Sequence, residues 1–163
     1  MPDRTVPFET TLHVRDRCMC LHAQRAARVL ARRFDEGLRP HGLTNEQFSL
    51  LMSLNRPKPA TIGALAQLLG ADRTTLTAAL KPLVRKGLAV VAPDPDDKRS
   101  RQVSLTGAGH DRLLAALPVW LSLHEALETG LDDPDPQRLR TGLNALAAWP
   151  GPTATTGTSE ETP

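Results

Sequence analysis

The amino-acid sequence predicts a mainly α chain with one small two-stranded β hairpin. Its 163 residues are 40% hydrophobic but only 3% aromatic, and tyrosine is absent. The core must therefore be built mostly from Leu, Ala and Val, a composition that suits helices. Helix-capping residues also recur just before apolar stretches with helical spacing. One short alternating stretch, residues 102–105, follows a charged loop and is typical of a hairpin strand.

The first part of the chain predicts a flexible N-terminus over residues 1–9 and then two helices. Residues 10–38 are rich in Ala, Leu and Arg, and we expect one long helix that ends before Pro40. Thr44 and Gln47 have the spacing of a capping box, which predicts that a second helix begins there. This helix should end near Asn55, ahead of a proline-containing linker.

The middle of the chain predicts two short helices separated by a tight turn. Thr61 is placed to cap the first helix, and Gly70 is placed to end it. Asp72 is placed to cap the second helix, which Gly87 ends. An apolar stripe should face inward from this second helix, formed by Leu76, Leu80, Leu83 and Val84. Two helices on either side of a tight turn indicate a helix-turn-helix.

The rest of the chain predicts a hairpin, two helices and a tail. Residues 88–91 should form one strand and residues 102–105 its partner. A long helix should follow from Thr106 to about residue 129, with a kink at Pro118. A last helix should begin at Pro136 and end near residue 148, and residues 149–163 have the small, polar composition of a disordered tail.

The distribution of charge suggests an anionic partner. The net charge is only +2, but residues 56–101 carry nine Lys or Arg against four Asp. A localised basic block of this kind is typical of a surface that meets a polyanion. No apolar stretch suggests a membrane span or a signal peptide, so we expect a cytoplasmic protein with reduced cysteines, Cys18 and Cys20.

The sequence contains none of the common short catalytic signatures. We find no glycine-rich phosphate loop, no metal-binding histidine pair on a helix and no serine elbow. We therefore expect a protein that is not an enzyme and needs no cofactor or metal. A helical interaction protein that ignores DNA is the alternative class, and the basic block argues against it.

The order of these elements and several short motifs resemble the MarR (multiple antibiotic resistance regulator) family. The resemblance covers about residues 17–148. It implies a winged helix-turn-helix over residues 43–105, in which the hairpin is the wing. It implies long dimerisation helices over residues 10–38 and 106–148. Together these parts would form a single domain over residues 10–148. It also implies a homodimeric transcription repressor that binds a pseudo-palindromic site in double-stranded DNA and is relieved by a small-molecule inducer. The matching stretches are LTNEQF from Leu43, IGALA from Ile62, DRTTLT from Asp72, LVRKGL from Leu83, and DKR from Asp97 with VSLT from Val103.

Candidate DNA contacts lie in the helix-turn-helix. Hydroxyl groups in the first turns of its second helix can reach phosphates or base edges, and threonine methyl groups can pack on thymine methyls. The same residues would also suit an ordinary surface helix with a cap. The candidates are Thr61, Arg73, Thr74, Thr75, Thr77 and Lys81.

The charged loop, residues 94–101, has three competing interpretations: a solvated turn, an acidic metal site, or a finger that grips an anion. Its aspartates lack the terminal Glu and the glycine that a calcium loop needs, and cations interrupt them. The resemblance implies that Arg99 enters the minor groove. Asp97 would then orient the Arg99 guanidinium through a bidentate pair. Lys98 and Arg101 would contact phosphates, with Ser100 beside them.

Two sets of residues are candidates for sensing a signal. Cys18, Cys20 and His22 could simply pack a dimer helix, could bind a metal or arsenical, or could sense oxidants. In a continuous helix, residues two apart point roughly 200° away from each other, which disfavours a Cys18–Cys20 disulfide. The organic-hydroperoxide branch of the family resembles this stretch at Cys18, although its activating tyrosines are missing here. A ligand pocket would be lined by His22, Phe48, Met52 and Trp120.

Overall fold

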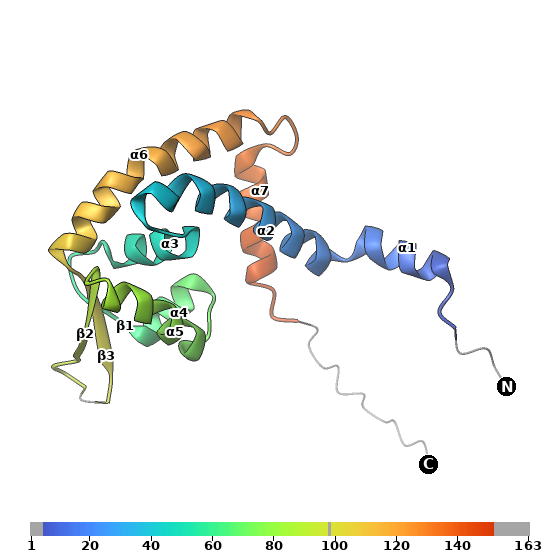
Figure 1. The fold of residues 1–163 in the computed structure, drawn as a ribbon. Helices are drawn as coiled ribbons and strands as arrows, with labels where there is room; N and C mark the ends of the chain where they lie inside the picture. The colour runs from blue at the N-terminus through green and yellow to red at the C-terminus, as the bar shows by residue number, and fades with distance from the viewer. Residues whose placement is uncertain (1–4, 98, 152–163) are drawn as a thin grey trace, which may run out of the picture. The chain divides into compact units, whose positions relative to one another are not determined.

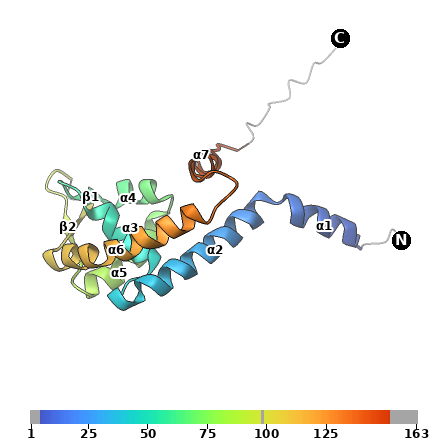
Figure 2. The same ribbon diagram turned by 90° about the horizontal axis from the view of Figure 1, so that it is seen from above.

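The computed structural model describes residues 5–97 and 99–151. Within them the chain is mainly helical with a small antiparallel sheet, which confirms the predicted fold class. In both views α3, α4, α5 and the sheet cluster beside the start of α6 (Figures 1 and 2). The elements are α1 (Phe8–Arg17), α2 (Met19–Leu38), a 3₁₀ turn (Arg39–His41), α3 (Asn45–Leu54), β1 (Ala60–Thr61), α4 (Ile62–Leu69), α5 (Arg73–Arg85), β2 (Ala89–Pro93), β3 (Arg101–Leu105), α6 (Gly107–Thr129) and α7 (Pro136–Ala147).

The chain divides into two compact units, one reaching to His124 and the other beginning at Glu125. The helix-turn-helix and the sheet belong entirely to the first unit. The second unit contains the end of α6 and all of α7. No helix in the described ranges has both the length and the apolar character needed to cross a bilayer. The predicted tail lies outside the described residues from residue 152 onward.

The long helix expected over residues 10–38 is interrupted, so that prediction was wrong. α1 begins at Phe8, inside the stretch expected to be a flexible terminus, and ends at Arg17. Cys18 has an extended backbone (φ −73°, ψ 100°), and its Sγ accepts a hydrogen bond from the N–H of Leu21 at 3.4 Å. No residue of α1 is buried, so tertiary packing does not hold α1 in line with α2.

The predicted capping residues begin the helices of the helix-turn-helix. Thr44 and Gln47 make both bonds of the capping box at the start of α3. Thr61 and Asp72 cap α4 and α5, and Gly70 ends α4 in the left-handed conformation at φ 62°. The core formed by these helices and the end of α2 is apolar and almost completely buried: Leu38, Phe48, Leu51, Leu65, Leu76, Leu80 and Leu83. Val84 was expected in this stripe, but it is 39% exposed.

The sheet has one strand more than predicted. Its order is β1-β3-β2, so β3 is the central strand, and both pairings are antiparallel. Val103 pairs with Val91 on one side and with Ala60 on the other. Because Val103 and Ala60 are both buried, β1 fixes the base of the wing to the core.

The start of α6 packs tightly against the wing base. The Thr106 hydroxyl donates a hydrogen bond to the Gly87 carbonyl at 2.7 Å, and it accepts one from the Gly109 N–H at 3.0 Å. The N–H of Thr106 donates to the Leu88 carbonyl at 3.2 Å. From there α6 continues as one helix through Pro118. This junction joins the hairpin to the helix without a flexible linker.

Candidate nucleic-acid interface

The start of α5 is shaped by the Asp72 cap. One carboxylate oxygen of Asp72 accepts the Thr75 N–H at 2.8 Å, and the other accepts the Thr75 hydroxyl at 2.7 Å. The backbone bond from Thr75, followed by its hydroxyl, lowers the pKa of Asp72. The Thr75 hydroxyl proton is therefore committed to the cap rather than offered to a partner.

Four of the predicted residues of α5 share one exposed face. They line a shallow hollow of about 330 Å³, formed by Arg73, Thr74, Thr77, Ala78 and Lys81. Thr75 is not among them, because it turns toward α3 and lines a different hollow with Asn45, Glu46 and Ser49. The exposed face has small side chains between a cation at each end, which is the character needed to approach a phosphate backbone closely.

Arg73 is packed against α4, a contact that the sequence did not reveal. A Cβ atom added to Gly63 would lie 3.0 Å from a terminal nitrogen of the Arg73 guanidinium. A glycine at this place therefore lets the guanidinium lie close to the start of α4. Thr61 is half-buried, and its hydroxyl accepts the N–H of Ala64 at 3.2 Å, so its principal contact is the α4 cap.

The wing tip is organised by carboxylates that accept backbone N–H groups. Asp94 is only 8% exposed, and its Oδ1 accepts the Asp96 N–H at 3.0 Å, a bond that lowers the pKa of Asp94. Asp97 Oδ1 accepts the N–H of Arg99 at 2.9 Å, and the Asp97 carbonyl accepts that of Ser100 at 2.8 Å. These contacts close a tight turn.

The predicted bidentate pair between Asp97 and the Arg99 guanidinium is not formed in the described part of the chain. The Asp97 carboxylate contacts the Arg99 backbone instead. Because Oδ1 closes the turn, it is not free to form one half of a two-oxygen pair with the guanidinium. Arg99 and Arg101 are exposed, and Lys98 lies outside the described residues.

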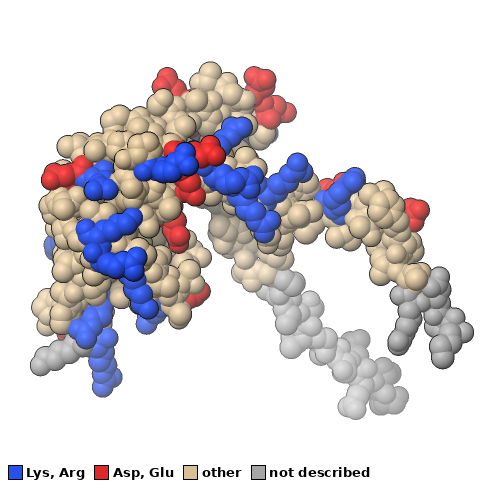
Figure 3. Space-filling view, viewed as in Figure 1, with Lys and Arg blue, Asp and Glu red and all other residues tan. Residues whose placement is uncertain are grey.

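A mostly apolar groove separates α5 from the wing. It has a volume of about 430 Å³, and Lys81, Arg85 and Arg101 stand among its lining residues. Basic side chains also gather over the wing and along α2 (Figure 3). Sequence reasoning missed Arg85 and Val91 in this groove, because only the folded hairpin brings β2 beside α5. The remaining lining residues are Ile62, Thr77, Leu80 and Val84.

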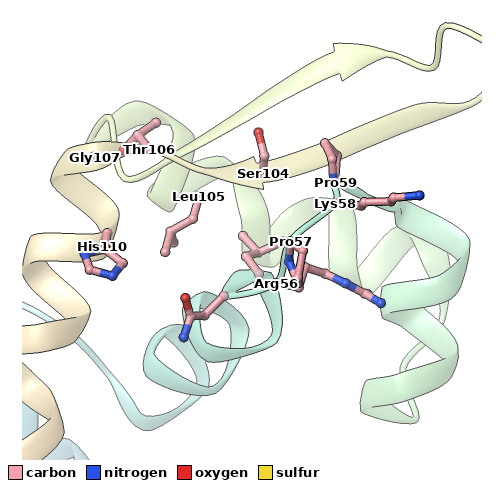
Figure 4. Close-up of a pocket in the computed structure, with 11 residues that line it drawn as sticks. Arg56, Pro57, Lys58, Pro59, Ser104, Leu105, Thr106, Gly107 and His110 are labelled. Atoms are coloured by element: carbon pink, nitrogen blue, oxygen red, sulfur yellow. The ribbon is translucent and has the colours of Figure 1, made fainter.

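A second hollow lies between the end of α3, the linker that follows it and the junction of β3 with α6. Its volume is about 350 Å³, and His110 and Leu105 contribute to its wall (Figure 4). Arg56 and Lys58 also line it, but their charged ends extend away from His110 (Figure 4). The charges therefore do not converge on a point where a small anion would sit.

The predicted ligand-pocket residues are only partly brought together. Phe48 is 2% exposed and stacks on Trp120, with ring centroids 5.9 Å apart. Trp120 stacks in turn on His124 at 4.4 Å, and Phe34 meets His124 edge-on. The stack runs from the buried Phe48 to the half-buried Trp120 and His124, and neither Phe34 nor His124 was singled out from the sequence. Met52 is half-buried, whereas His22 is exposed near the start of α2.

The two cysteines occupy different settings. Cys18 is half-buried at the break between α1 and α2, and Cys20 is exposed in the first turn of α2. Because Cys18 lies outside the helix, the continuous-helix geometry that disfavoured a Cys18–Cys20 disulfide is not present. The described residues contain no cluster of three or more His, Cys, Asp or Glu side chains arranged to hold a metal ion.

Comparison with known proteins supports this architecture. The sequence model of the MarR family matches residues 41–100. Among curated proteins, the transcriptional activatory protein BadR of Rhodopseudomonas palustris is 35% identical over 86 residues, which are 51% of this chain and 49% of BadR. The regulator SarZ of Staphylococcus epidermidis is 27% identical over 93 residues, covering 57% of this chain and 63% of SarZ. The chain thus spans about half the length of BadR and somewhat more of SarZ.

Solved structures match over more of their length. The Mycobacterium tuberculosis regulator MosR, in complex with DNA, is 35% identical with a TM-score of 0.73, covering 80% of this chain and 93% of MosR. The repressor CouR, bound to a 23-mer duplex, is 27% identical with a TM-score of 0.69, covering 83% of this chain and 96% of CouR. On the order of its elements, the geometry of its helix-turn-helix and wing, and these matches, the chain belongs to the MarR family of transcription regulators.

Proposed function

We propose that this protein is a sequence-specific, double-stranded-DNA-binding transcription regulator that acts as a homodimer on a pseudo-palindromic site. The observation that carries the proposal is the exposed face of α5, formed by Arg73, Thr74, Thr77 and Lys81. It lies beside the mostly apolar groove between α5 and the wing, whose lining also includes the cations Lys81, Arg85 and Arg101. MosR and CouR, which share this fold, have been solved with DNA.

In this proposal α5 enters the major groove and the wing reaches the neighbouring minor groove. Arg73 and Lys81 contact guanine edges or phosphates, and the N-terminus of α4 at Thr61 approaches the backbone. Arg99 enters the minor groove, where a narrow A·T-rich tract concentrates negative potential. Asp97 contributes indirectly, because the N–H bond that it accepts fixes the turn from which Arg99 projects. Ser100, Arg101 and Lys98 flank this contact.

Dimerisation is supported by apolar side chains that the single chain leaves exposed. On α7, Leu139, Leu143 and Leu146 lie three or four residues apart and are 37–48% exposed. Covering them with a second copy would remove this apolar surface from water. The α5 helices of the two subunits would then lie one turn of DNA apart, roughly 34 Å.

The dimer contact can be tested at the centre of this apolar stripe. Leu143→Asp would place a charge in the interface, and we expect monomers with reduced DNA affinity by sedimentation and anisotropy. Asn144→Asp is the charge-matched control, because Asn144 is exposed and lies on a different face of α7 from Leu139, Leu143 and Leu146. A Leu143→Asp dimer that binds DNA normally would contradict this placement.

The same proposal includes repression that a small-molecule inducer relieves. CouR is a repressor, whereas BadR is an activatory protein, so the direction of regulation needs its own measurement. A reporter driven by the DNA upstream of the chain's own gene should be silenced by the protein. Increased reporter output with the protein present would contradict repression without contradicting DNA binding.

DNA binding itself is tested by fluorescence anisotropy with the DNA upstream of the chain's own gene and with unrelated DNA of equal length. We expect site-selective binding that weakens steeply as salt rises, because bound phosphates release counterions. Arg99→Ala should weaken it, with Arg25→Ala, on the exposed face of α2, as the charge-matched control. Equal affinity for both DNAs would favour a non-specific or non-DNA interaction protein.

A thiol-regulated form of the same regulator is the second candidate. The observation that favours it is the position of Cys18, half-buried at the break between α1 and α2 and bonded through Sγ to the first turn of α2. Oxidation of a thiol at that point would change the α2 cap. We expect mild oxidant to weaken DNA binding in the wild type but not in Cys18→Ser, with recovery on adding dithiothreitol. Equal responses in both proteins would exclude Cys18 as the sensor.

A further inference from the structure

The exposed face of α5 has an unusual chemical composition for a surface that reads bases. Its five lining residues are two cations, two threonines and one alanine: Arg73, Lys81, Thr74, Thr77 and Ala78. None is Asn or Gln, the side chains that read adenine through paired hydrogen bonds in the major groove. An A·T pair in front of this face can therefore be recognised mainly from its thymine side, which offers O4 and the 5-methyl group.

The hydroxyl of Thr77 is turned back onto its own helix. It donates a hydrogen bond to the Arg73 carbonyl at 2.6 Å. This bond fixes the side-chain rotamer and uses the only proton that the hydroxyl can donate. Thr77 is nevertheless exposed, so its methyl group becomes the part of the side chain available to a partner. The exposed methyl group of Ala78 lies next to it in the chain.

The neighbouring cations frame this pair of methyl groups. Arg73 lies against Gly63 of α4, and Lys81 is one turn farther along α5 than Thr77. Thr74 has no protein partner for its hydroxyl among the described residues, so it can still donate or accept a hydrogen bond. The face therefore presents a small apolar centre between polar and charged neighbours.

We propose that Thr77, with Ala78 beside it, reads thymine methyl groups in the major groove of each half-site. This specificity contact is apolar and rests on the proposed DNA-binding function. Burying one thymine methyl against it should strengthen binding about fourfold per half-site, the effect expected for one methyl group removed from water.

The test removes single methyl groups from the DNA. A bound duplex is first selected from a random pool by the full-length protein, and each thymine is then replaced singly by deoxyuridine, which lacks only the 5-methyl group. Dissociation constants are measured by anisotropy. We expect one or two positions per half-site at which the replacement weakens wild-type binding about fourfold, and near-neutral replacements elsewhere.

Two matched variants assign the effect to Thr77. Thr77→Ser keeps the hydroxyl but lacks the methyl, so it should lose the sensitivity to deoxyuridine at that position. Thr77→Val keeps the methyl but lacks the hydroxyl, so it should retain the sensitivity. Circular dichroism checks that both variants keep the helical content of the wild type.

The outcomes separate this inference from the function on which it rests. If the selected duplex is bound tightly but no deoxyuridine replacement matters, methyl reading is wrong and DNA binding stands. If Thr77→Ser keeps the full deoxyuridine effect, another residue reads the methyl and the assignment to Thr77 fails. If no duplex is selected above unrelated DNA, the proposed function fails, and this inference fails with it.

Discussion

Replacing Gly109 by alanine should disrupt the junction between α6 and the wing. A Cβ atom at Gly109 would lie 2.0 Å from the Leu88 carbonyl oxygen and 3.0 Å from Leu105 Cδ1. The first of these contacts is far inside van der Waals distance, and it involves backbone rather than a flexible side chain. Either α6 or the wing base must move by about 1 Å to relieve it.

Two destabilising contributions and one stabilising contribution set the change in the free energy of unfolding. Overpacking of this kind costs about 1–3 kcal/mol. The same carbonyl accepts the Thr106 N–H at 3.2 Å, and losing that bond costs about 1 kcal/mol. The higher helix propensity of alanine returns about 1 kcal/mol. We therefore expect Gly109→Ala to lower the free energy of unfolding by about 1–3 kcal/mol.

The assay is urea unfolding followed by circular dichroism, with Gly107→Ala as the control. Gly107 is in the same turn of α6, but a Cβ there meets nothing within 4 Å. The control should be at least as stable as the wild type and up to about 1 kcal/mol more stable, because it gains the same helix propensity without a clash. If Gly109→Ala were as stable as Gly107→Ala, the direct packing of α6 on the wing base would be refuted.

Three further predictions concern polar contacts. Asp97→Ala should weaken DNA binding despite adding net positive charge, because the turn that presents Arg99 loses its N–H acceptor. Asp97→Asn should restore most of the affinity. Tighter binding by Asp97→Ala in anisotropy would disprove this role. The pKa of Asp72 is lowered in the folded protein, so its contribution to stability is complete above the ordinary aspartate pKa of about 3.9 and is lost as the pH falls through the folded value. Asp72→Asn should remove this part of the acid dependence of unfolding, and an unchanged acid limb would contradict it. Lys86→Met should lower the free energy of unfolding by about 0.5–1.5 kcal/mol in urea titrations, because Lys86 Nζ donates to the Gly42 carbonyl at 2.8 Å; an unchanged midpoint would show that this bond contributes nothing.

The parts of the fold that could be predicted from the sequence depend on local contacts. Thr44, Thr61 and Asp72 cap helices through atoms only three residues away, so the cap and the helix start are visible together in the sequence. The break at Cys18 could not be predicted, since it depends on the absence of packing around α1. β1 was missed because its partner Val103 is more than forty residues away.

For the candidate interface, the sequence predicted which helix and hairpin are involved more accurately than it predicted the contacts of their side chains. The sequence identified α5 and the wing, but the direction of each side chain depends on hydrogen bonds that only the fold defines. Thr75 is drawn into the Asp72 cap, and Asp97 contacts a backbone N–H rather than a guanidinium. Gly63 and Arg85 were missed, because their importance comes from α4 and β2 lying beside α5.

The most direct test of the central claim is hydroxyl-radical footprinting of the full-length protein on a selected duplex. We expect two protected windows whose centres lie one helical turn apart, about 10–10.5 base pairs, or a multiple of that spacing. We also expect Arg99→Ala to lose the flanking minor-groove protection while the central protection remains. Protection that does not differ from that of unrelated DNA, or a single window without this spacing, would contradict the claim that α5 and the wing read a two-fold site.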